Sequence, residues 1–195
     1  WRMKKETPYP IFQIGFNKCG TTSLHDFFVK NGYASHHWDN GKIAKTIKEN
    51  LNSNNILKSY SKNSFFCDIE CVDELIFAQN YFKELSQCYP LAKFILNIRD
   101  KNKWIKSRLL HNNKTYVFKN NNAYSKLLNI KSDESFLADL WSRQWDFHIQ
   151  KVKNFFNNSD KLLVFDIEKD NIYKLIDFFK DLDLNKEHWS ISNKT

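Results

Sequence analysis

The segment from residue 15 to residue 24, GFNKCGTTSL, gathers side chains that can bind an anion. It joins a short apolar stretch, typical of a buried strand, to a stretch whose apolar residues recur at helical spacing. Glycines allow the backbone to turn sharply so that several N–H groups face one point, and the start of a helix adds positive potential there. Lys18 supplies a mobile ammonium group, and Thr21, Thr22 and Ser23 supply hydroxyl donors. The segment therefore predicts an anion-binding loop.

A second group of candidates follows the most apolar stretch of the chain, residues 92–98. That stretch is typical of a central strand, and Arg99 comes directly after it. In a parallel α/β sheet, ligands bind beyond the carboxyl ends of the strands, so Arg99 and the anion-binding loop can contact one ligand. The planar arginine fork suits a two-point contact with phosphate. Ser107 falls in the opening turns of the next expected helix, within reach of the same phosphate.

The loop does not match the nucleotide-binding pattern GxxxxGK[ST], because Lys18 precedes the second glycine instead of following it. The spacing is therefore not that of an ATP-hydrolysing enzyme. Both segments have a plain structural alternative: a tight turn capped by Thr or Ser for the loop, and a surface pair of Arg99 with Asp100 for the second segment. Glycine is scarce, with 4 in 195 residues, so the presence of two in this one turn favours the anion site.

Strands and helices alternate along the chain, and no repeat or low-complexity linker divides it, so we expect a single domain over residues 1–195. We expect strands over residues 11–15, 33–38, 64–69, 92–98 and 161–167, and helices over residues 22–31, 40–51, 72–89, 102–111, 137–156 and 171–182. Gly32 fits the position that ends the first helix, and the Asn-rich residues 112–132 are expected to form a long loop or lid. This order predicts the α/β class, with a central, mostly parallel sheet flanked by helices in three layers.

The net charge of +8 suggests a nucleic-acid or membrane-surface partner. Most of the basic residues are lysines, however, and Asn, Phe and Ile are also abundant, which is typical of a compositional bias. The excess of basic over acidic residues lies almost wholly before residue 112, where both candidate anion contacts fall. The sequence therefore favours a small anionic ligand, and nucleic acid becomes a minor alternative.

The remaining features exclude several classes of protein. The four cysteines, Cys19, Cys67, Cys71 and Cys88, lack the paired spacing of a zinc site and are too few for a disulfide scaffold, so we expect reduced thiols. No stretch approaches the ~20 apolar residues that span a bilayer, and no signal-peptide pattern is visible. The chain begins with Trp1, which leaves open a missing upstream targeting segment, and we expect a cytoplasmic location.

Together, the loop and the Arg99 segment resemble the sulfotransferases that use 3′-phosphoadenosine 5′-phosphosulfate (PAPS). The loop is similar to the KxGTTSL-like element that binds the 5′-phosphosulfate in that family, and Arg99 with Ser107 is similar to its R-x7-S element, which binds the 3′-phosphate. Similarity to the small bacterial-type branch covers nearly the whole chain: HWD at 37–39, DIE at 68–70, YPLAKFILNIRD at 89–100, LLVFDIEKD at 162–170, and the closing residues Asn193 to Thr195. The resemblance implies a P-loop NTPase-like fold.

Carried over residue by residue, the resemblance implies the following contacts. The loop residues Lys18, Cys19, Gly20, Thr21, Thr22 and Ser23 would bind the 5′-phosphosulfate, and Arg99 and Ser107 would bind the 3′-phosphate, with a minor contribution from Lys194. The reaction would be in-line transfer of a sulfuryl group to an acceptor hydroxyl, without a metal and with 3′-phosphoadenosine 5′-phosphate (PAP) as product. Lys18 would also be catalytic, because a lysine near the bridging oxygen stabilises charge on the leaving phosphate. The expected partner is a small-molecule or carbohydrate acceptor, not nucleic acid.

A general base must take the proton of the acceptor, and His36, His37, Asp68 and Glu70 are the candidates. The family uses His in some branches and Glu in others, so the resemblance leaves this choice open. Strand alternation lets at most one of the two histidines face the site. We favour His37, because an unperturbed histidine pKa suits a base at neutral pH, with Asp68 or Glu70 orienting it or replacing it. The alternative for His37 is a hydrogen-bonded structural residue packed beside Trp38.

Two rival functions are also compatible with the sequence. A P-loop nucleotide or small-molecule kinase would share the sheet and the phosphate loop, although the position of Lys18 argues against it. A non-catalytic basic module that binds nucleic acid or sulfated glycan would fit the net charge and would show a steep salt dependence. Binding of PAP, and turnover of ATP with magnesium, distinguish these functions.

Overall fold

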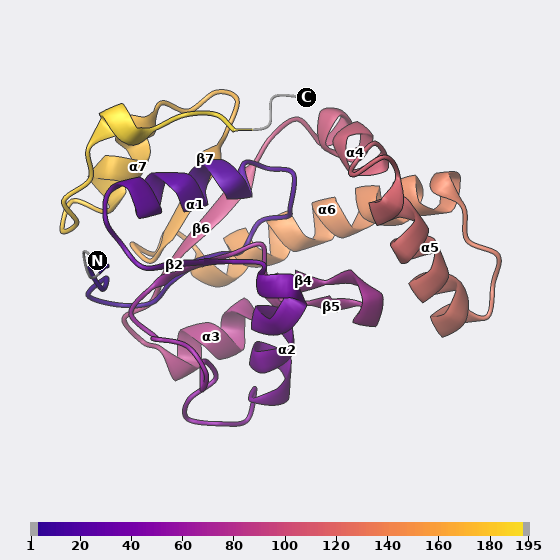
Figure 1. Ribbon diagram of the computed structural model, residues 1–195, viewed down its shortest axis with the longest axis horizontal. Helices are drawn as coiled ribbons and strands as arrows, with labels where there is room; N and C mark the ends of the chain where they lie inside the picture. The colour runs from indigo at the N-terminus through magenta and orange to yellow at the C-terminus, as the bar shows by residue number, and fades with distance from the viewer. Residues whose placement is uncertain (1–3, 193–195) are drawn as a thin grey trace.

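A five-stranded parallel sheet forms the centre of the computed structural model, which describes residues 4–192 (Figure 1). Its strands are β1 (Ile11–Gln13), β2 (Ser35–His37), β3 (Phe65–Cys67), β6 (Lys93–Ile98) and β7 (Leu162–Asp166), in the spatial order β2-β3-β1-β6-β7. All four neighbouring pairs are parallel. The predicted α/β class with a parallel sheet is therefore confirmed. Asn193, Lys194 and Thr195 lie outside the described residues.

Helices cover both faces of this sheet, as Figure 1 shows. One face carries α1 (Thr21–Lys30) and α7 (Ile172–Phe178), and the other carries α2 (Lys42–Glu49), α3 (Phe82–Cys88) and α6 (Glu134–Phe156). Two further helices, α4 (Lys101–Leu109) and α5 (Thr115–Leu128), lie beyond the carboxyl end of the sheet. A short antiparallel hairpin of β4 (Glu70–Cys71) and β5 (Ile76–Phe77) follows β3. The predicted three layers are thus present.

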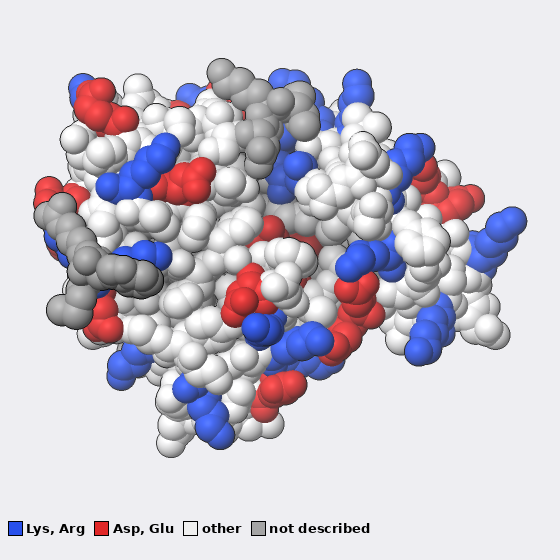
Figure 2. Space-filling model, viewed as in Figure 1, with Lys and Arg blue, Asp and Glu red and all other residues white. Residues whose placement is uncertain are grey.

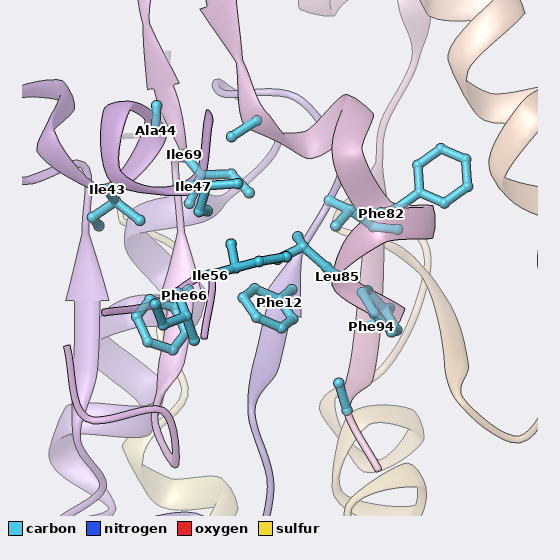
Figure 3. Packing of buried hydrophobic residues seen from close by; sticks show 14 of the residues in the cluster. Phe12, Ile43, Ala44, Ile47, Ile56, Phe66, Ile69, Phe82, Leu85 and Phe94 are labelled. Atoms are coloured by element: carbon cyan, nitrogen blue, oxygen red, sulfur yellow. The ribbon is translucent and has the colours of Figure 1, made fainter. Parts of the chain in front are cut away.

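Two hydrophobic clusters cover the two faces of the sheet, because successive strand residues point to opposite sides, and a third lies among the loop after β1, α4, α5 and α6. In β1, Phe12 faces the α2 and α3 side, where its ring centroid lies 5.4 Å from that of Phe66 and 5.7 Å from that of Phe94 (Figure 3). The neighbouring residue Ile11 packs in the cluster that contains Phe28 of α1. Each of these side chains is fully buried, and burial of one such side chain stabilises the fold by about 1.5–3 kcal/mol.

Gly32 ends the first helix as expected. Its φ of +87° lies in the left-handed region, which a glycine adopts without strain. The N–H of Gly32 donates to the carbonyl of Val29 at 2.9 Å, and the N–H of Tyr33 donates to that of Phe28 at 3.0 Å. These two bonds satisfy carbonyls that the end of a helix otherwise leaves unpaired.

The expected loop over residues 112–132 is wrong, because α5 occupies most of that segment. Tyr116, Asn120 and Tyr124 lie on its buried face, at the spacing of successive helical turns. Asn120 is completely buried, and its Nδ2 donates to the carbonyl of Tyr116 at 2.8 Å. Packing therefore overrides the low helix propensity of an Asn-rich stretch.

The expected helix over residues 72–89 is also wrong over its first half. That half contains two 3₁₀ turns, Val72–Glu74 and Ala78–Tyr81, with β5 between them, and only α3 is α-helical. Leu75 has a φ of +51°, which a regular helix does not tolerate. The backbone instead pairs across the hairpin, where Glu70 lies opposite Phe77. The prediction was wrong because the apolar residues of these short elements happen to recur at the spacing of a single helix.

Replacing Gly15 by Ala tests the close packing at the end of β1. An added Cβ would lie 2.2 Å from the backbone oxygen of Asn97, an atom that cannot move without disturbing β6. We expect Gly15→Ala to lower the free energy of unfolding by about 3 kcal/mol, measured by urea denaturation. Gly32→Ala is the control, since a Cβ there meets no atom within 4 Å and only the left-handed backbone opposes it, at a cost of about 1 kcal/mol. An equal cost for the two variants would contradict this account of the packing.

Candidate active site

A cleft of about 730 Å³ opens at the carboxyl ends of the strands, between the start of α1 and the segment containing α4 and α5. Nine of the candidate residues line it: Lys18, Gly20, Thr21, Thr22, His37, Asp68, Glu70, Arg99 and Ser107. Figure 2 shows acidic side chains gathered beside a hollow in the middle of this face, over β4. One cleft thus holds both the expected anion contacts and the candidate bases.

The loop between β1 and α1 has its carbonyl groups turned into the protein. Six successive carbonyls accept hydrogen bonds from buried or half-buried side chains: Ile14 from His148 (2.6 Å), Gly15 from Gln13 (2.6 Å), Phe16 and Cys19 from Asn97 (3.5 and 2.7 Å), Asn17 from Trp104 (2.9 Å) and Lys18 from Arg99 (3.1 Å). In a trans peptide the N–H points away from the carbonyl. Carbonyls fixed toward the core therefore turn N–H groups of the loop the other way, toward the cleft, where the N–H of Asn17 donates to Glu70.

The start of α1 adds to this anion-binding character. Gly20 precedes the helix with a φ of +80°, and an added Cβ would lie 2.6 Å from Cδ1 of Ile167. Within the described part of the chain, no side chain caps the first turn and no acidic residue lies in it. The positive end of the helix dipole is therefore directed at the cleft, which Gly20 and Thr21 line.

Lys18 extends from the loop with a left-handed φ of 61°. Burial lowers the pKa of its ammonium group, the positive charge of Arg99 lowers it further, and the carboxylate of Asp68 opposes both effects. A bound anion would compensate for the lost hydration and for the repulsion between the two cations. Burying a lysine beside an arginine destabilises the free protein, and such an arrangement is typical of a site that binds an anion.

Arg99 and Ser107 both line the cleft, and each has one buried polar atom without a partner among the described residues. One Nη of Arg99 donates to the Lys18 carbonyl, and the other donates to Oε1 of Glu168 at 3.1 Å. Its Nε and the hydroxyl of Ser107 are buried and have no hydrogen-bond partner among the described residues. Since unpaired buried polar atoms are costly, these two atoms fit a ligand with several acceptor oxygens.

His37 and Asp68 form the opposite wall of the cleft. Nε2 of His37 lies 3.6 Å from Oδ2 of Asp68 and has no hydrogen-bond partner in the described structure. Burial, with a smaller contribution from nearby His25, lowers the pKa of His37 to about 4, and the carboxylate of Asp26 opposes this shift. Burial and, to a smaller extent, the carboxylate of Glu70 raise the pKa of Asp68 to about 7, against the opposing charges of Arg108 and Lys18. His36 points to the other face, where its ring stacks on Phe66 at 5.1 Å, as strand alternation predicts.

Glu70 is buried and uses both carboxylate oxygens in contacts with the protein. Oε1 accepts from the N–H of Asn17 and from Nε2 of Gln79, each at 3.3 Å. Oε2 accepts from the hydroxyl of Tyr116 at 2.9 Å and lies 3.5 Å from Nη2 of Arg108. This carboxylate connects the anion-binding loop to α4 and α5, so its oxygens are less available to a substrate than those of Asp68.

Arg108 lies behind the cleft, and sequence reasoning missed its role. It is 1% exposed, pairs with Glu70, and donates to the hydroxyl of Tyr116. Its guanidinium lies between aromatic rings, 4.9 Å from the centroid of Trp104 and 4.5 Å from that of Trp141. The one available signal is the spacing of Trp104 and Arg108, which places them on the same face of α4.

Several residues that line the cleft were also missed, among them Asn17, Trp38, His111, Tyr116, Lys119 and Ser192. Two expected loop contacts lie behind the cleft instead. The thiol of Cys19 is completely buried, which raises its pKa, and the hydroxyl of Ser23 accepts from the N–H of Ser192 at 2.9 Å. Only the backbone of Cys19 could contact a ligand. All four cysteines are free thiols.

Comparison with known proteins gives one family. A family model described as a sulfotransferase domain matches residues 10–181. The matched range contains the anion-binding loop, His37, Asp68, Arg99 and Ser107. No curated protein matches the chain. In the part of the chain that the structure describes, no helix is both long enough and apolar enough to cross a membrane.

Acid should destabilise the protein through His37. Its pKa is about 4 in the folded state and 6.5 without the fold, so on acidification the unfolded state takes up the proton first, and stability falls as the pH drops through this window. Between pH 7 and pH 5 we expect the wild type to lose about 2 kcal/mol more than His37→Gln, measured by urea unfolding at each pH.

Comparison of the two proteins removes the contribution of Asp68 to the pH dependence. Asp68 has the opposite effect, because its raised pKa stabilises the fold as the pH falls, but it is present in both proteins. An equal pH dependence of the wild type and His37→Gln would contradict the buried, uncharged state of His37.

Proposed function

The chain belongs to the sulfotransferase family, and from this premise we propose that it transfers the sulfuryl group of PAPS to an acceptor hydroxyl, in particular of a carbohydrate. One observation carries the proposal. Phosphate-binding groups from two neighbouring strands, β1 and β6, line the same cleft as a pair of proton-accepting groups, His37 and Asp68. This arrangement suits a doubly phosphorylated donor on one side and a hydroxyl acceptor on the other.

The donor would be held by the loop and by the Arg99 segment. Lys18, Thr21, Thr22 and the N–H groups at the start of α1 would bind the 5′-phosphosulfate, since the loop carbonyls are already paired elsewhere. Arg99 and Ser107 would bind the 3′-phosphate, and the unpaired Nε and hydroxyl of these residues support that assignment. These residues would suit any ligand with two separate anionic groups.

The protein would assist the transfer by charge and by position. The donor supplies a sulfuryl group, whose sulfur forms a bond to the acceptor oxygen while its bond to the phosphate oxygen breaks. Lys18 would stabilise the negative charge that develops on the leaving phosphate. The proton of the acceptor hydroxyl would pass to the His37 and Asp68 pair, and the products would be PAP and the sulfated acceptor.

Asp68 is the better-matched member of this pair at neutral pH. A base is most effective when its pKa lies near the working pH, and the pKa of Asp68 is about 7 whereas that of His37 is about 4. The two groups lie 3.6 Å apart, so they would share the accepted proton. His37 is the base that the sequence favoured. In this arrangement it would orient the acceptor hydroxyl and share the accepted proton with Asp68.

Trp38 supports a ring-shaped acceptor. It follows His37, lines the cleft, and is 46% exposed, which is unusual for so large an apolar side chain. Its backbone is held in the left-handed region, with a φ of 55°, by the bond from the Gly41 N–H to the Trp38 carbonyl at 3.0 Å. Asn40 and Thr115 add polar groups to the lining. An exposed ring beside polar groups suits the apolar face and the hydroxyls of a sugar.

Calorimetric titration with PAP tests the donor assignment. We expect the wild type to bind PAP and Arg99→Ala to bind it at least about tenfold more weakly, because a hydrogen bond to a charged group contributes about 1.5–3 kcal/mol. Arg143→Ala is the matched control, since Arg143 lies exposed on α6, outside the cleft, and its loss should leave the affinity unchanged.

Two results would contradict the donor assignment. One is a folded wild type that does not bind PAP at high micromolar concentration. The other is Arg99→Ala binding as tightly as the wild type, which would remove the 3′-phosphate role. Turnover of ATP with magnesium would instead favour a P-loop kinase.

Removal of either member of the proton-accepting pair should slow the reaction without weakening donor binding. We expect His37→Ala and Asp68→Asn each to lower the rate of PAP release from PAPS, with a carbohydrate acceptor present, by about 100-fold or more. The affinity for PAP should stay unchanged in both. His36→Ala is the control, because His36 faces the core. Full rates in both variants would exclude the pair and leave Glu70 as the remaining candidate base.

A further inference from the structure

Two completely buried amide side chains connect the central strands beneath the anion-binding loop. Gln13 is the last residue of β1, and Asn97 lies in the neighbouring strand β6. Nε2 of Gln13 donates to Oδ1 of Asn97 and to the carbonyl of Gly15, both at 2.6 Å. Nδ2 of Asn97 donates to the carbonyls of Cys19 and Phe16 at 2.7 and 3.5 Å. The pair therefore holds both ends of the loop.

Gln13 also reaches the other wall of the cleft. Its Oε1 accepts from the backbone N–H of Asp68 at 2.9 Å. Asp68 directly follows β3, the other neighbour of β1, and its φ of 52° lies in the left-handed region, where a non-glycine residue is strained. This hydrogen bond crosses from β1 to that turn and helps to hold it.

We propose that Gln13 is a positioning residue that couples the donor loop to the turn carrying Asp68, with Asn97 as its partner. The inference rests on the proposed function, because it assigns the two walls to donor and proton acceptor. Both amides use all their N–H groups, so no alternative partner competes for them. Gly15 allows the approach, since an added Cβ would lie 2.2 Å from Oδ1 of Asn97. One side chain thus links the turn that carries Asp68 to the loop that would bind the phosphosulfate.

Gln13→Met tests the coupling. Methionine keeps the unbranched length but has neither the donor nor the acceptor, so it leaves the Gly15 carbonyl and the Asp68 N–H unpaired. In the full chain, we expect the dissociation constant for PAP to rise at least about tenfold. We also expect the amide hydrogen of Asp68 to exchange with solvent at least about tenfold faster, while that of Phe65, which donates to the Ala34 carbonyl, keeps its rate.

Leu96→Ala is the control for loss of stability alone. Leu96 is completely buried next to Asn97 in the chain and packs in the cluster on the α2 and α3 side, where its side chain makes none of the hydrogen bonds that hold the loop. This variant should melt at a lower temperature and yet bind PAP like the wild type, with an unchanged exchange rate at Asp68. Asn97→Leu is a second test variant that leaves the bond between Gln13 and Asp68 in place. It should weaken PAP binding while Asp68 stays protected.

The outcomes separate the two proposals. If the wild type binds PAP and Gln13→Met and Asn97→Leu bind it equally well, the coupling is wrong and the donor assignment stands. If Asp68 exchanges at the wild-type rate in Gln13→Met, the coupling is wrong as well. If the wild type does not bind PAP, the proposed function fails, and the exchange rate of Asp68 still reports on the hydrogen bond from which the coupling was inferred.

Discussion

The site depends on one constraint: the six carbonyls from Ile14 to Cys19 point into the protein, and each accepts a hydrogen bond from a side chain there. No backbone N–H group of a described helix or strand supplies these donors. They come instead from side chains on β1, β6, α4 and α6 and from Arg99 at the end of β6, and the sheet must bring these elements together in one place before the loop can form. The same contacts turn the N–H groups of the loop outward. The proposed capacity to bind an anion therefore follows from how the core satisfies its own backbone.

The charges of the cleft are arranged around a second buried feature, the pair of Glu70 and Arg108. Burying two charges is costly unless both are well hydrogen-bonded, and here Tyr116, Asn17 and Gln79 complete the contacts of the carboxylate. The pair connects the loop to α4 and α5, which form one side of the cleft. The charges of Glu70 and Arg108 neutralise each other. Lys18 and Asp68 therefore set the electrostatic potential on the two opposite walls of the cleft. That separation is what a transfer from an anionic donor to a neutral hydroxyl needs.

Much of the fold and part of the site could be predicted from the sequence, because these features are encoded in short segments of the chain. The alternation of strands and helices, the turn after β1 and the position of Arg99 after β6 are read from short segments, and parallel strands bring such ends to one edge. The helix α5 was missed because its Asn-rich sequence has a low propensity and is stabilised by packing, and the hairpin of β4 and β5 was missed because Leu75 gives no sign of its left-handed backbone. The partners of the loop carbonyls, such as Asn97 and Trp104, and the pairing of Glu70 with Arg108 depend on tertiary contacts, which no local pattern encodes.

The central claim is that one cleft binds both phosphates of a PAPS-type nucleotide, one at the loop and the other at Arg99 and Ser107. Phosphorus NMR of PAP during titration with the full chain tests it most directly, because the 5′- and 3′-phosphates give separate resonances. The account predicts that both resonances shift or broaden together with the same saturation. A change in one resonance alone, or in neither, would contradict it.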